Sequence, residues 1–196
     1  MKIKYLNLEK LNKETVQEIK EDTFFVIKPV KKDIKRTIKL DIAKKGTSVN
    51  IVFASVINAK KLDLDIETIH KKPKTNSNIQ IRTILEEGAH FKFKGNIKIT
   101  DKSDGTKGIL NIKGLSIGEN ITWEVKPNLE IENNQISANH KASLINFSKK
   151  QLTYLTSRGL SQEEALTNLK KGFILEVLEE IPENKAKRTI IGALNP

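Results

Sequence analysis

Apolar and polar residues alternate through most of the first 146 residues of the chain. The alternation is clear at Ile38, Leu40 and Ile42, and glycine, asparagine and aspartate separate the later segments that repeat it. These segments cover residues 49–53, 62–66, 79–81, 91–99, 110–117, 121–125, 129–131 and 136–144. A period of two over short stretches bounded by turn residues is typical of half-buried strands. The pattern therefore predicts a mainly β body over residues 21–146.

The alternation leaves the architecture of this body open. Turns of the Asn-Gly type are few, whereas glycines such as Gly46, Gly88 and Gly105 fall at intervals of about one short strand. This spacing suits a sandwich or a barrel, and it suits a solenoid with two or three strands per coil equally well. Periodicity alone does not decide between them.

The first residues of the chain have a different spacing. Leu8, Leu11, Val16 and Ile19 recur at roughly helical intervals. We expect an N-terminal arm or short helix over residues 1–20. The apolar run at residues 24–27 then predicts the opening strand.

The apolar period changes from two to about four near Phe147. Ser148 with Gln151, and Ser161 with Glu164, have the spacing of helix N-caps and their reciprocal partners. Gly159 between them is the kind of residue that ends a helix. The pattern predicts a C-terminal two-helix segment over residues 147–182, followed by a tail over residues 183–196.

The second of these helices is apolar over more than one face. Its main stripe is widened by further apolar residues, and together they are Ala165, Leu166, Leu169, Phe173, Ile174, Leu175, Val177, Leu178 and Ile181. Either the helix is buried between the β body and the preceding helix, or part of it forms a surface for another protein. The pattern favours neither reading.

The net charge of +11 would ordinarily suggest a nucleic-acid partner. Most cations are lysines scattered along every segment, without aromatic residues between them for base stacking. Arginine binds phosphate in bidentate fashion, and the arginines are Arg36, Arg82, Arg158 and Arg188. We therefore expect a solvated lysine-rich surface and no specific nucleic-acid partner.

The sequence lacks the residues that several kinds of functional site require. Cysteine is absent, which excludes disulfides and thiolate ligands. The chain has no phosphate-binding loop, dinucleotide fingerprint, serine nucleophile elbow or His-Glu-x-x-His motif. His70 and His90 lack metal-ligand spacing and are expected to be ordinary polar positions. We predict no catalytic residues, no metal site and no enzymatic activity.

No membrane segment is expected either. Residues 1–20 mix charged residues with leucine and isoleucine and contain no uninterrupted apolar run. The prediction is a cytoplasmic protein with no membrane partner.

Short motifs follow one another in a fixed order from residue 127 to residue 165. They are Pro127 with Leu129-Glu130-Ile131, Asn139-His140-Lys141-Ala142-Ser143, Gln151-Leu152-x-Tyr154-Leu155, Ser157-Arg158-Gly159-Leu160 and Glu163-Glu164-Ala165. This succession resembles the core of the SufB/SufD family, the iron–sulfur cluster assembly subunits of the SUF system. The resemblance runs without a gap from about residue 111 to residue 182. It implies a right-handed parallel β-helix with a C-terminal helical segment.

The resemblance also implies that this chain carries out no reaction by itself. Where SufB-type members carry a cysteine this chain has Ile112, and Lys141 replaces the acidic residue that follows the motif histidine. Of these three positions, only His140 carries the residue that the family pattern has there. The implied protein is a short, SufD-like, non-enzymatic scaffold that binds no cofactor by itself. His140 is then either a ligand near a transient iron–sulfur cluster at a subunit interface or a hydrogen-bonded structural histidine.

Two partners follow from the resemblance. A SufC-like ABC ATPase would dock on the helical end, where the candidate contact residues are Tyr154, Arg158, Phe173, Leu175 and Leu178. A SufB-like paralogue, or a second copy in a homodimer, would pair along the last strands. The alternative is a stand-alone β-helix structural or protein-binding module with no role in cluster assembly.

Overall fold

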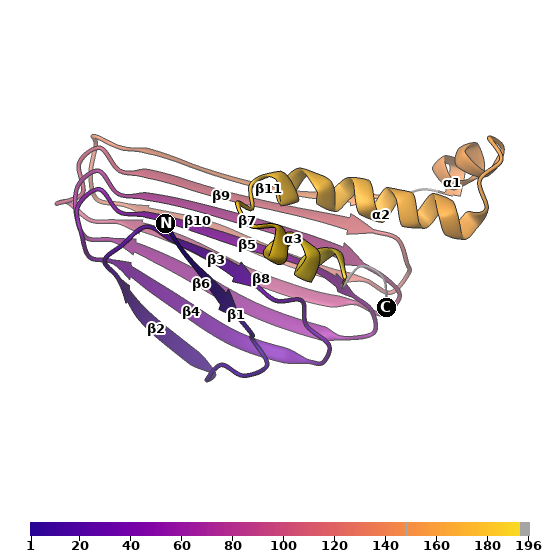
Figure 1. Cartoon of the computed structure of the whole chain (residues 1–196), viewed down its shortest axis with the longest axis horizontal. Coiled ribbons are helices and arrows are strands. Elements are labelled where there is room, and N and C mark those ends of the chain that lie inside the picture. The colour runs from indigo at the N-terminus through magenta and orange to yellow at the C-terminus, as the bar shows by residue number, and fades with distance from the viewer. Residues whose placement is uncertain (148, 193–196) are drawn as a thin grey trace.

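The protein consists of eleven strands and three helices within the residues that the structure describes, 1–147 and 149–192 (Figure 1). The structure is a computed structural model. The strands are β1 (Lys2–Leu6), β2 (Glu14–Ile19), β3 (Thr23–Ile27), β4 (Ile34–Ile42), β5 (Ser48–Ile57), β6 (Lys61–His70), β7 (Asn76–Leu85), β8 (His90–Ile99), β9 (Lys107–Ser116), β10 (Thr122–Ile131) and β11 (Ser137–Asn146). The helices are α1 (Lys149–Thr156), α2 (Gln162–Glu179) and α3 (Asn184–Ile191).

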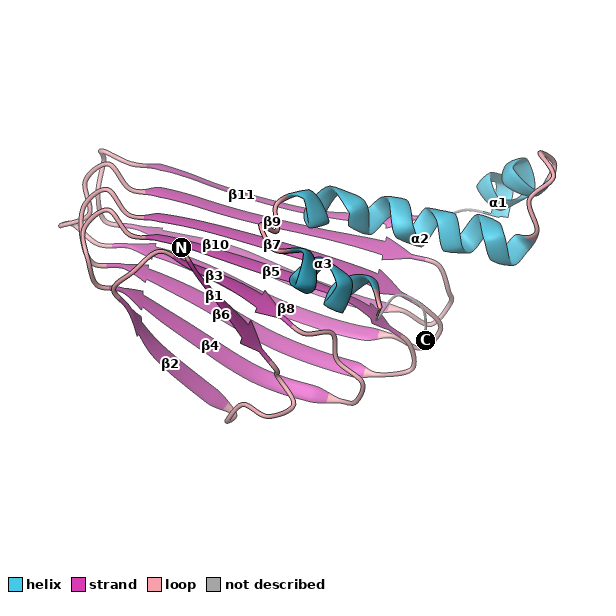
Figure 2. Cartoon of the chain, viewed as in Figure 1, coloured by secondary structure: helices cyan, strands magenta, loops and turns pink. Residues whose placement is uncertain are grey.

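The strands form two sheets in which every pairing is parallel. Sheet A has the order β1-β3-β5-β7-β9-β11, and sheet B has the order β10-β8-β6-β4-β2. Because consecutive strands lie in opposite sheets, the chain winds as a solenoid that adds one strand to each sheet per coil (Figure 2). Parallel pairing excludes a hairpin-built sandwich or barrel. The parallel β-helix implied by the family resemblance is confirmed.

The inward side chains of both sheets pack into one continuous apolar cluster. Ile51, Ile79 and Leu110 are aligned by the strand register of β5, β7 and β9, and all three are fully buried. The same alignment recurs along each strand, so apolar residues about 4.8 Å apart stack on one another from coil to coil. The solenoid is therefore held together by interior rows as well as by strand pairing.

Gly95 creates space for two neighbours in this interior. A Cβ atom at Gly95 would lie 2.6 Å from Cδ2 of Leu110 and 2.7 Å from Cε1 of Phe93. We expect Gly95→Ala to lower the free energy of unfolding by about 1–3 kcal/mol through overpacking, as measured by urea denaturation. Gly172→Ala in α2 is the matched control, because nothing lies within 4 Å of a Cβ there. It should raise stability by about 0.5–1 kcal/mol, and a loss of equal size in both variants would contradict the packing argument.

The predicted N-terminal helix is wrong. Residues 1–20 contain β1 and β2, which form the first coil of the solenoid. Strand β2 pairs with β4 from Glu14 opposite Thr37 to Ile19 opposite Ile42. This pairing with a neighbouring coil overrides the weak helical spacing. Leu8, which contributed to that spacing, is fully buried in the interior cluster.

The helices α2 and α3 cover the outer face of sheet A (Figures 1 and 2). Ile174 and Val177 of α2 pack with Val52 and Ile84 of the sheet in a second apolar cluster. The predicted capping box is confirmed, because the Glu164 backbone N–H donates to Ser161 Oγ and the Ser161 N–H donates to the Glu164 carboxylate. The other predicted cap, Ser148 with the side chain of Gln151, lies outside the described residues.

The predicted tail contains a third helix. Ala186 and Ile190 of α3 are fully buried in the apolar cluster on sheet A, and Tyr5 Oη donates a 2.6 Å hydrogen bond to Glu183 Oε2. Helix α3 therefore connects the C-terminal part of the chain to the first strand, an interaction between distant residues that local patterning cannot predict. Among the described residues, no helix combines the length and apolar character that crossing a bilayer requires.

Candidate functional site

The two ends of the solenoid differ in how they could receive another protein. Strands β10 and β11 are ten residues long and are paired along one side only. At the other end β1 and β2 have five and six residues. Lys2 and Lys4 of β1 lie opposite Thr23 and Phe25, in the row that faces the interior, and the Lys4 ammonium lies 5.6 Å from the Phe25 ring centroid. Inward-facing charges and short strands discourage edge association, so the open edges are those of β10 and β11.

His140 lies on β11 at this open end. It pairs in register with Leu110 of β9, so it belongs to an interior row of the solenoid. Leu110 is fully buried, whereas His140 is exposed because no further coil covers it. An imidazole in this position faces whatever binds against the last coil.

Ile112 and Lys141 lie close to His140 in the register. Ile112 pairs with Ala142 and is fully buried in the interior cluster, so its side chain contributes to the core. Lys141 pairs with Asn111 in the alternate row, on the outer face of sheet A. Among the described residues no three His, Cys, Asp or Glu side chains are grouped so that they could hold a metal ion.

Tyr154 and Arg158 form a second candidate surface on α1 and the turn after it. The Arg158 guanidinium carbon lies 5.3 Å from the centroid of the Tyr154 ring, and both side chains are exposed. Gly159 has a φ of +92°, which confirms its role in ending the helix. The pair presents an aromatic face and a cation together, a combination common in protein interfaces.

The candidate contact residues on α2 separate into buried and exposed positions. Leu178 is 4% exposed and packs against sheet A, and Phe173 is half-buried beside the same cluster. Leu175 is 55% exposed. Most of the apolar side chains of α2 therefore cover sheet A. Leu175 is the large apolar side chain that the helix exposes to solvent.

Polar contacts fix the position of α2 on the sheet. Glu176 accepts hydrogen bonds from Lys113 Nζ at 2.7 and 2.8 Å, and its carboxylate lies 3.7 Å from Arg82 Nη2. Asn78 Nδ2 donates to Glu180 at 3.1 Å. These contacts join α2 to β7 and β9 and orient its outer face.

Arg82 is the side chain in this region that sequence reasoning missed. It is 1% exposed, and its Nη1 donates to the Ile81 carbonyl at 3.1 Å. Burial lowers the pKa of the guanidinium, and the Glu176 carboxylate opposes that shift. No local pattern signals this burial, because it depends on α2 lying over β7.

Replacing Glu176 with glutamine tests this attachment. The hydrogen bond from Lys113 holds the pKa of Glu176 below its usual value. We expect Glu176→Gln to lower the free energy of unfolding by about 1 kcal/mol, a modest loss because Glu176 is itself half exposed. Chemical denaturation measures it, with the exposed neighbour Glu179→Gln as control. If the two variants lose the same free energy of unfolding, the contact of Glu176 with Arg82 and Lys113 does not position α2.

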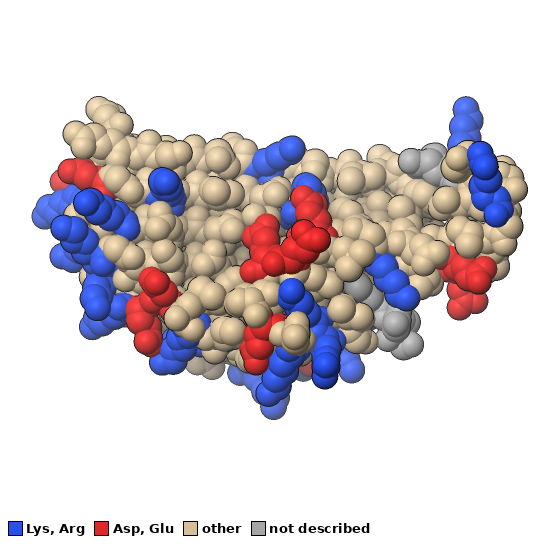
Figure 3. Space-filling view, turned by 45° about the horizontal axis from the view of Figure 1, so that its top comes forward, with Lys and Arg blue, Asp and Glu red and all other residues tan. Residues whose placement is uncertain are grey.

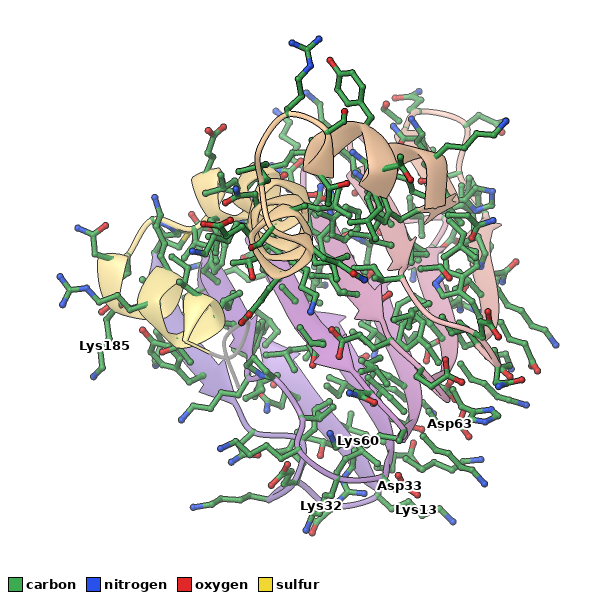
Figure 4. All side chains as sticks on the ribbon, turned by 90° about the vertical axis from the view of Figure 1, so that its right-hand side faces the viewer. Lys13, Lys32, Asp33, Lys60, Asp63 and Lys185 are labelled. Atoms are coloured by element: carbon green, nitrogen blue, oxygen red, sulfur yellow. The ribbon has the colours of Figure 1, made fainter. Side chains whose placement is uncertain are left out.

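A hollow of about 570 Å³ opens at the starts of β4, β6 and β8, and Asp33 and Asp63 are among its lining residues (Figure 4). Both of its carboxylates already have partners. Lys35 Nζ lies 3.3 Å from Asp63 Oδ2, and Asp33 accepts a 2.9 Å hydrogen bond from the Lys61 backbone N–H. We therefore place the candidate site at the β10–β11 edge and the α1–α2 surface.

Comparison with known proteins decides the family. The sequence model for the SUF system FeS cluster assembly, SufBD core domain matches residues 24–173, from β3 into α2. The chain belongs to the SufB/SufD family. The match includes both parts of the candidate site, the last strands with His140 and the helical segment with Tyr154 and Arg158.

Curated SufB/SufD relatives agree with this assignment. The chain is 33% identical over 138 residues to an iron–sulfur cluster assembly SufBD family protein of Staphylococcus aureus (strain USA300), a match that covers 70% of this chain and 29% of the relative. A SufBD family protein of Staphylococcus epidermidis matches with the same identity and coverage. The chain thus spans less than a third of the length of the curated SufB/SufD proteins that it matches.

Proposed function

We propose that this chain is a non-enzymatic scaffold subunit of a SUF-type iron–sulfur cluster assembly complex. Its β10–β11 edge would pair with a second copy or with a SufB-like paralogue, and its α1–α2 surface would dock a SufC-like ABC ATPase. Membership of the SufB/SufD family supports a role in iron–sulfur cluster assembly. The ten-residue strands β10 and β11, each without a neighbour along one edge, support pairing with another subunit at that end. The observation that carries the proposal is that the family match, residues 24–173, covers the β10–β11 edge and the part of the α1–α2 surface that holds Tyr154 and Arg158.

In this proposal His140 acts only when a partner is present. An exposed imidazole in an interior row would be enclosed once another subunit covers the last coil. A neutral imidazole is a good ligand for iron, and thiolates from a cysteine-bearing partner would supply the softer ligands. The cluster is cargo passed through the complex, and this chain contributes one side chain toward holding it.

The ATPase contact depends on the part of α1 and α2 that stays exposed. Leu175 would supply the apolar centre of the contact, with Tyr154 and Arg158 beside it. Leu178 and Phe173 would support this surface from beneath, since they pack toward sheet A. Aromatic, arginine and apolar side chains are the types that dominate binding energy at interfaces.

Co-purification from the source cell extract tests the proposal. Tagged wild-type protein is expected to retain an ABC-type ATPase, and Leu175→Asp to lose it with an unchanged melting temperature. Val16→Asp is the matched control, because Val16 is 60% exposed but lies on β2 in the other sheet. Failure of the wild type to retain any ATPase would leave the stand-alone β-helix module as the better reading.

A further inference from the structure

Seven lysines that are far apart in the sequence lie close together at one end of the folded chain. The turns β4–β5, β6–β7 and β8–β9 all lead from sheet B back to sheet A and lie on adjacent coils. They carry the exposed residues Lys44, Lys45, Lys71, Lys72, Lys74 and Lys102, and exposed Lys107 begins β9 beside them. We call these seven lysines the lysine corner. Figure 3 shows basic side chains crowded at the left end of the molecule, where these turns lie. Stacking of coils thus brings together lysines that are far apart in the sequence.

Backbone hydrogen bonds hold these turns in register. The Gly46 N–H donates to the Pro73 carbonyl at 3.1 Å, and the Lys74 N–H donates to the Asp104 carbonyl at 2.7 Å. Adjacent turns are therefore separated by about one strand spacing, 4.8 Å. The lysine corner extends only about 10 Å along the solenoid.

Lysines outnumber carboxylates at the corner, where seven lysines lie with Asp101 and Asp104 of the β8–β9 turn and with Asp41 of β4. Among the described residues, its one salt bridge joins Lys71 to Asp41 at 2.7 Å. Asp104, on the β8–β9 turn, already accepts a hydrogen bond from the side chain of Asn133. The flanking turns carry Lys20, Glu21 and Asp22 on one side and Glu132 on the other, and Glu21 is paired with Lys2 and Glu132 with Lys98. The corner is therefore a short basic patch whose neighbouring turns carry no excess of lysine.

Lys74 has a backbone conformation that favours glycine. Its φ is +57°, and the positions stacked on it in the neighbouring turns are Gly46, with φ +76°, and Gly105, with φ +68°. A lysine in the left-handed region is less favourable than a glycine. Glycine would suit this turn position at least as well as lysine, so replacing Lys74 with glycine removes the charge without disturbing the turn.

A buried polar network supports the corner from beneath. His70 Nδ1 lies 2.8 Å from Thr75 Oγ1, and Thr75 Oγ1 lies 3.0 Å from Thr106 Oγ1 on the next turn. Ser103 Oγ donates to the His70 carbonyl at 2.7 Å. All four side chains are fully buried. The lysines thus extend from a rigid base, which reduces the ordering cost of binding.

We propose that the lysine corner binds a compact carboxylate-rich patch on a partner protein. Lysine without arginine or aromatic neighbours gives point charges, which suit carboxylates and provide neither bidentate phosphate binding nor base stacking. The turns on either side carry no excess of lysine, so an anionic surface that extends beyond the corner, such as a duplex or a bilayer, would gain little from them. Such a patch steers an acidic partner to the scaffold and raises its association rate.

This inference deepens the proposed function, because it supplies an entry point for acidic proteins that exchange with the scaffold. It is tested on the isolated protein without any ATPase, so its failure is separate from failure of the co-purification. The probe is a fluorescent deca-glutamate peptide, with binding followed by anisotropy at low salt. Vesicles rich in phosphatidylglycerol and a single-stranded oligonucleotide are the competing probes.

The triple variant Lys72→Glu, Lys74→Glu, Lys102→Glu is expected to bind the peptide about tenfold more weakly than the wild type. The charge-matched control is Lys31→Glu, Lys171→Glu, Lys185→Glu, which changes exposed lysines elsewhere and should bind nearly as the wild type does. Equal losses in the two triple variants would overturn the proposal. So would tighter, corner-dependent binding of vesicles or oligonucleotide than of peptide.

Lys74→Gly separates binding from folding. Glycine suits the left-handed turn, so this variant is expected to melt at a higher temperature than the wild type while binding the peptide more weakly. A variant that gains stability and keeps full affinity would show that the Lys74 charge has no part in binding.

Discussion

Phe93→Ala is expected to lower the free energy of unfolding by about 4 kcal/mol. Phe93 is 2% exposed, and its ring stacks on that of Phe91 with centroids 6.1 Å apart. It also fills the space beside Gly95, where no side chain competes for it. Truncation would leave a cavity in the middle of the interior cluster, between coils that cannot close without breaking strand pairing.

Urea denaturation of the whole chain measures this loss, and Ile145→Ala provides the control. Ile145 is also on a strand, but its side chain is 47% exposed, so its truncation should cost under about 1 kcal/mol. A loss below about 2 kcal/mol for Phe93→Ala would mean that the coils relax into the cavity and that the interior rows are less rigid than the register implies.

Acidification from pH 7.5 to pH 4.5 is expected to remove about 2–3 kcal/mol of stability through His70. Burial lowers the pKa of His70 from 6.5 to about 4. The folded state therefore binds the proton less well than the unfolded state. The stabilising contribution is complete above pH 6.5 and is lost as the pH falls from 6.5 through 4.

His70→Asn isolates this effect, because asparagine keeps hydrogen-bonding groups without titrating near neutral pH. Its free energy of unfolding should change less between pH 7.5 and pH 4.5 than that of the wild type. His140→Asn, at an exposed position, should follow the wild-type profile. If all three proteins show the same pH dependence, protonation of His70 does not limit stability in acid.

The strands could be predicted from the sequence, but their direction could not. Residues such as Ile38, Leu40 and Ile42 alternate between core and surface in the same way in parallel and antiparallel sheets. The parallel β-helix came instead from the motifs around His140 and Arg158. The prediction of a helix near the N-terminus was wrong because the spacing of Leu8 and Ile19 carries no information about strand pairing between coils.

The positions of the candidate site residues in the fold were predictable where those residues lie close together in the sequence. The motifs located His140 on the last strand and Tyr154 with Arg158 at the helical end. They could not separate exposed Leu175 from buried Leu178, because that depends on how α2 lies on sheet A. The burial of Arg82 and the clustering of the lysines likewise arise only when distant segments meet in the fold.

The unequal ends of the solenoid would limit how large the proposed assembly can grow. A rod with two receptive ends could add subunits indefinitely and form fibres. Here the end with β1 and β2 carries inward lysines and short strands, whereas the end with β10 and β11 is open. In the pairing proposed above, joining two β10–β11 ends would leave the β1–β2 ends facing outward, so the assembly would stop at a pair.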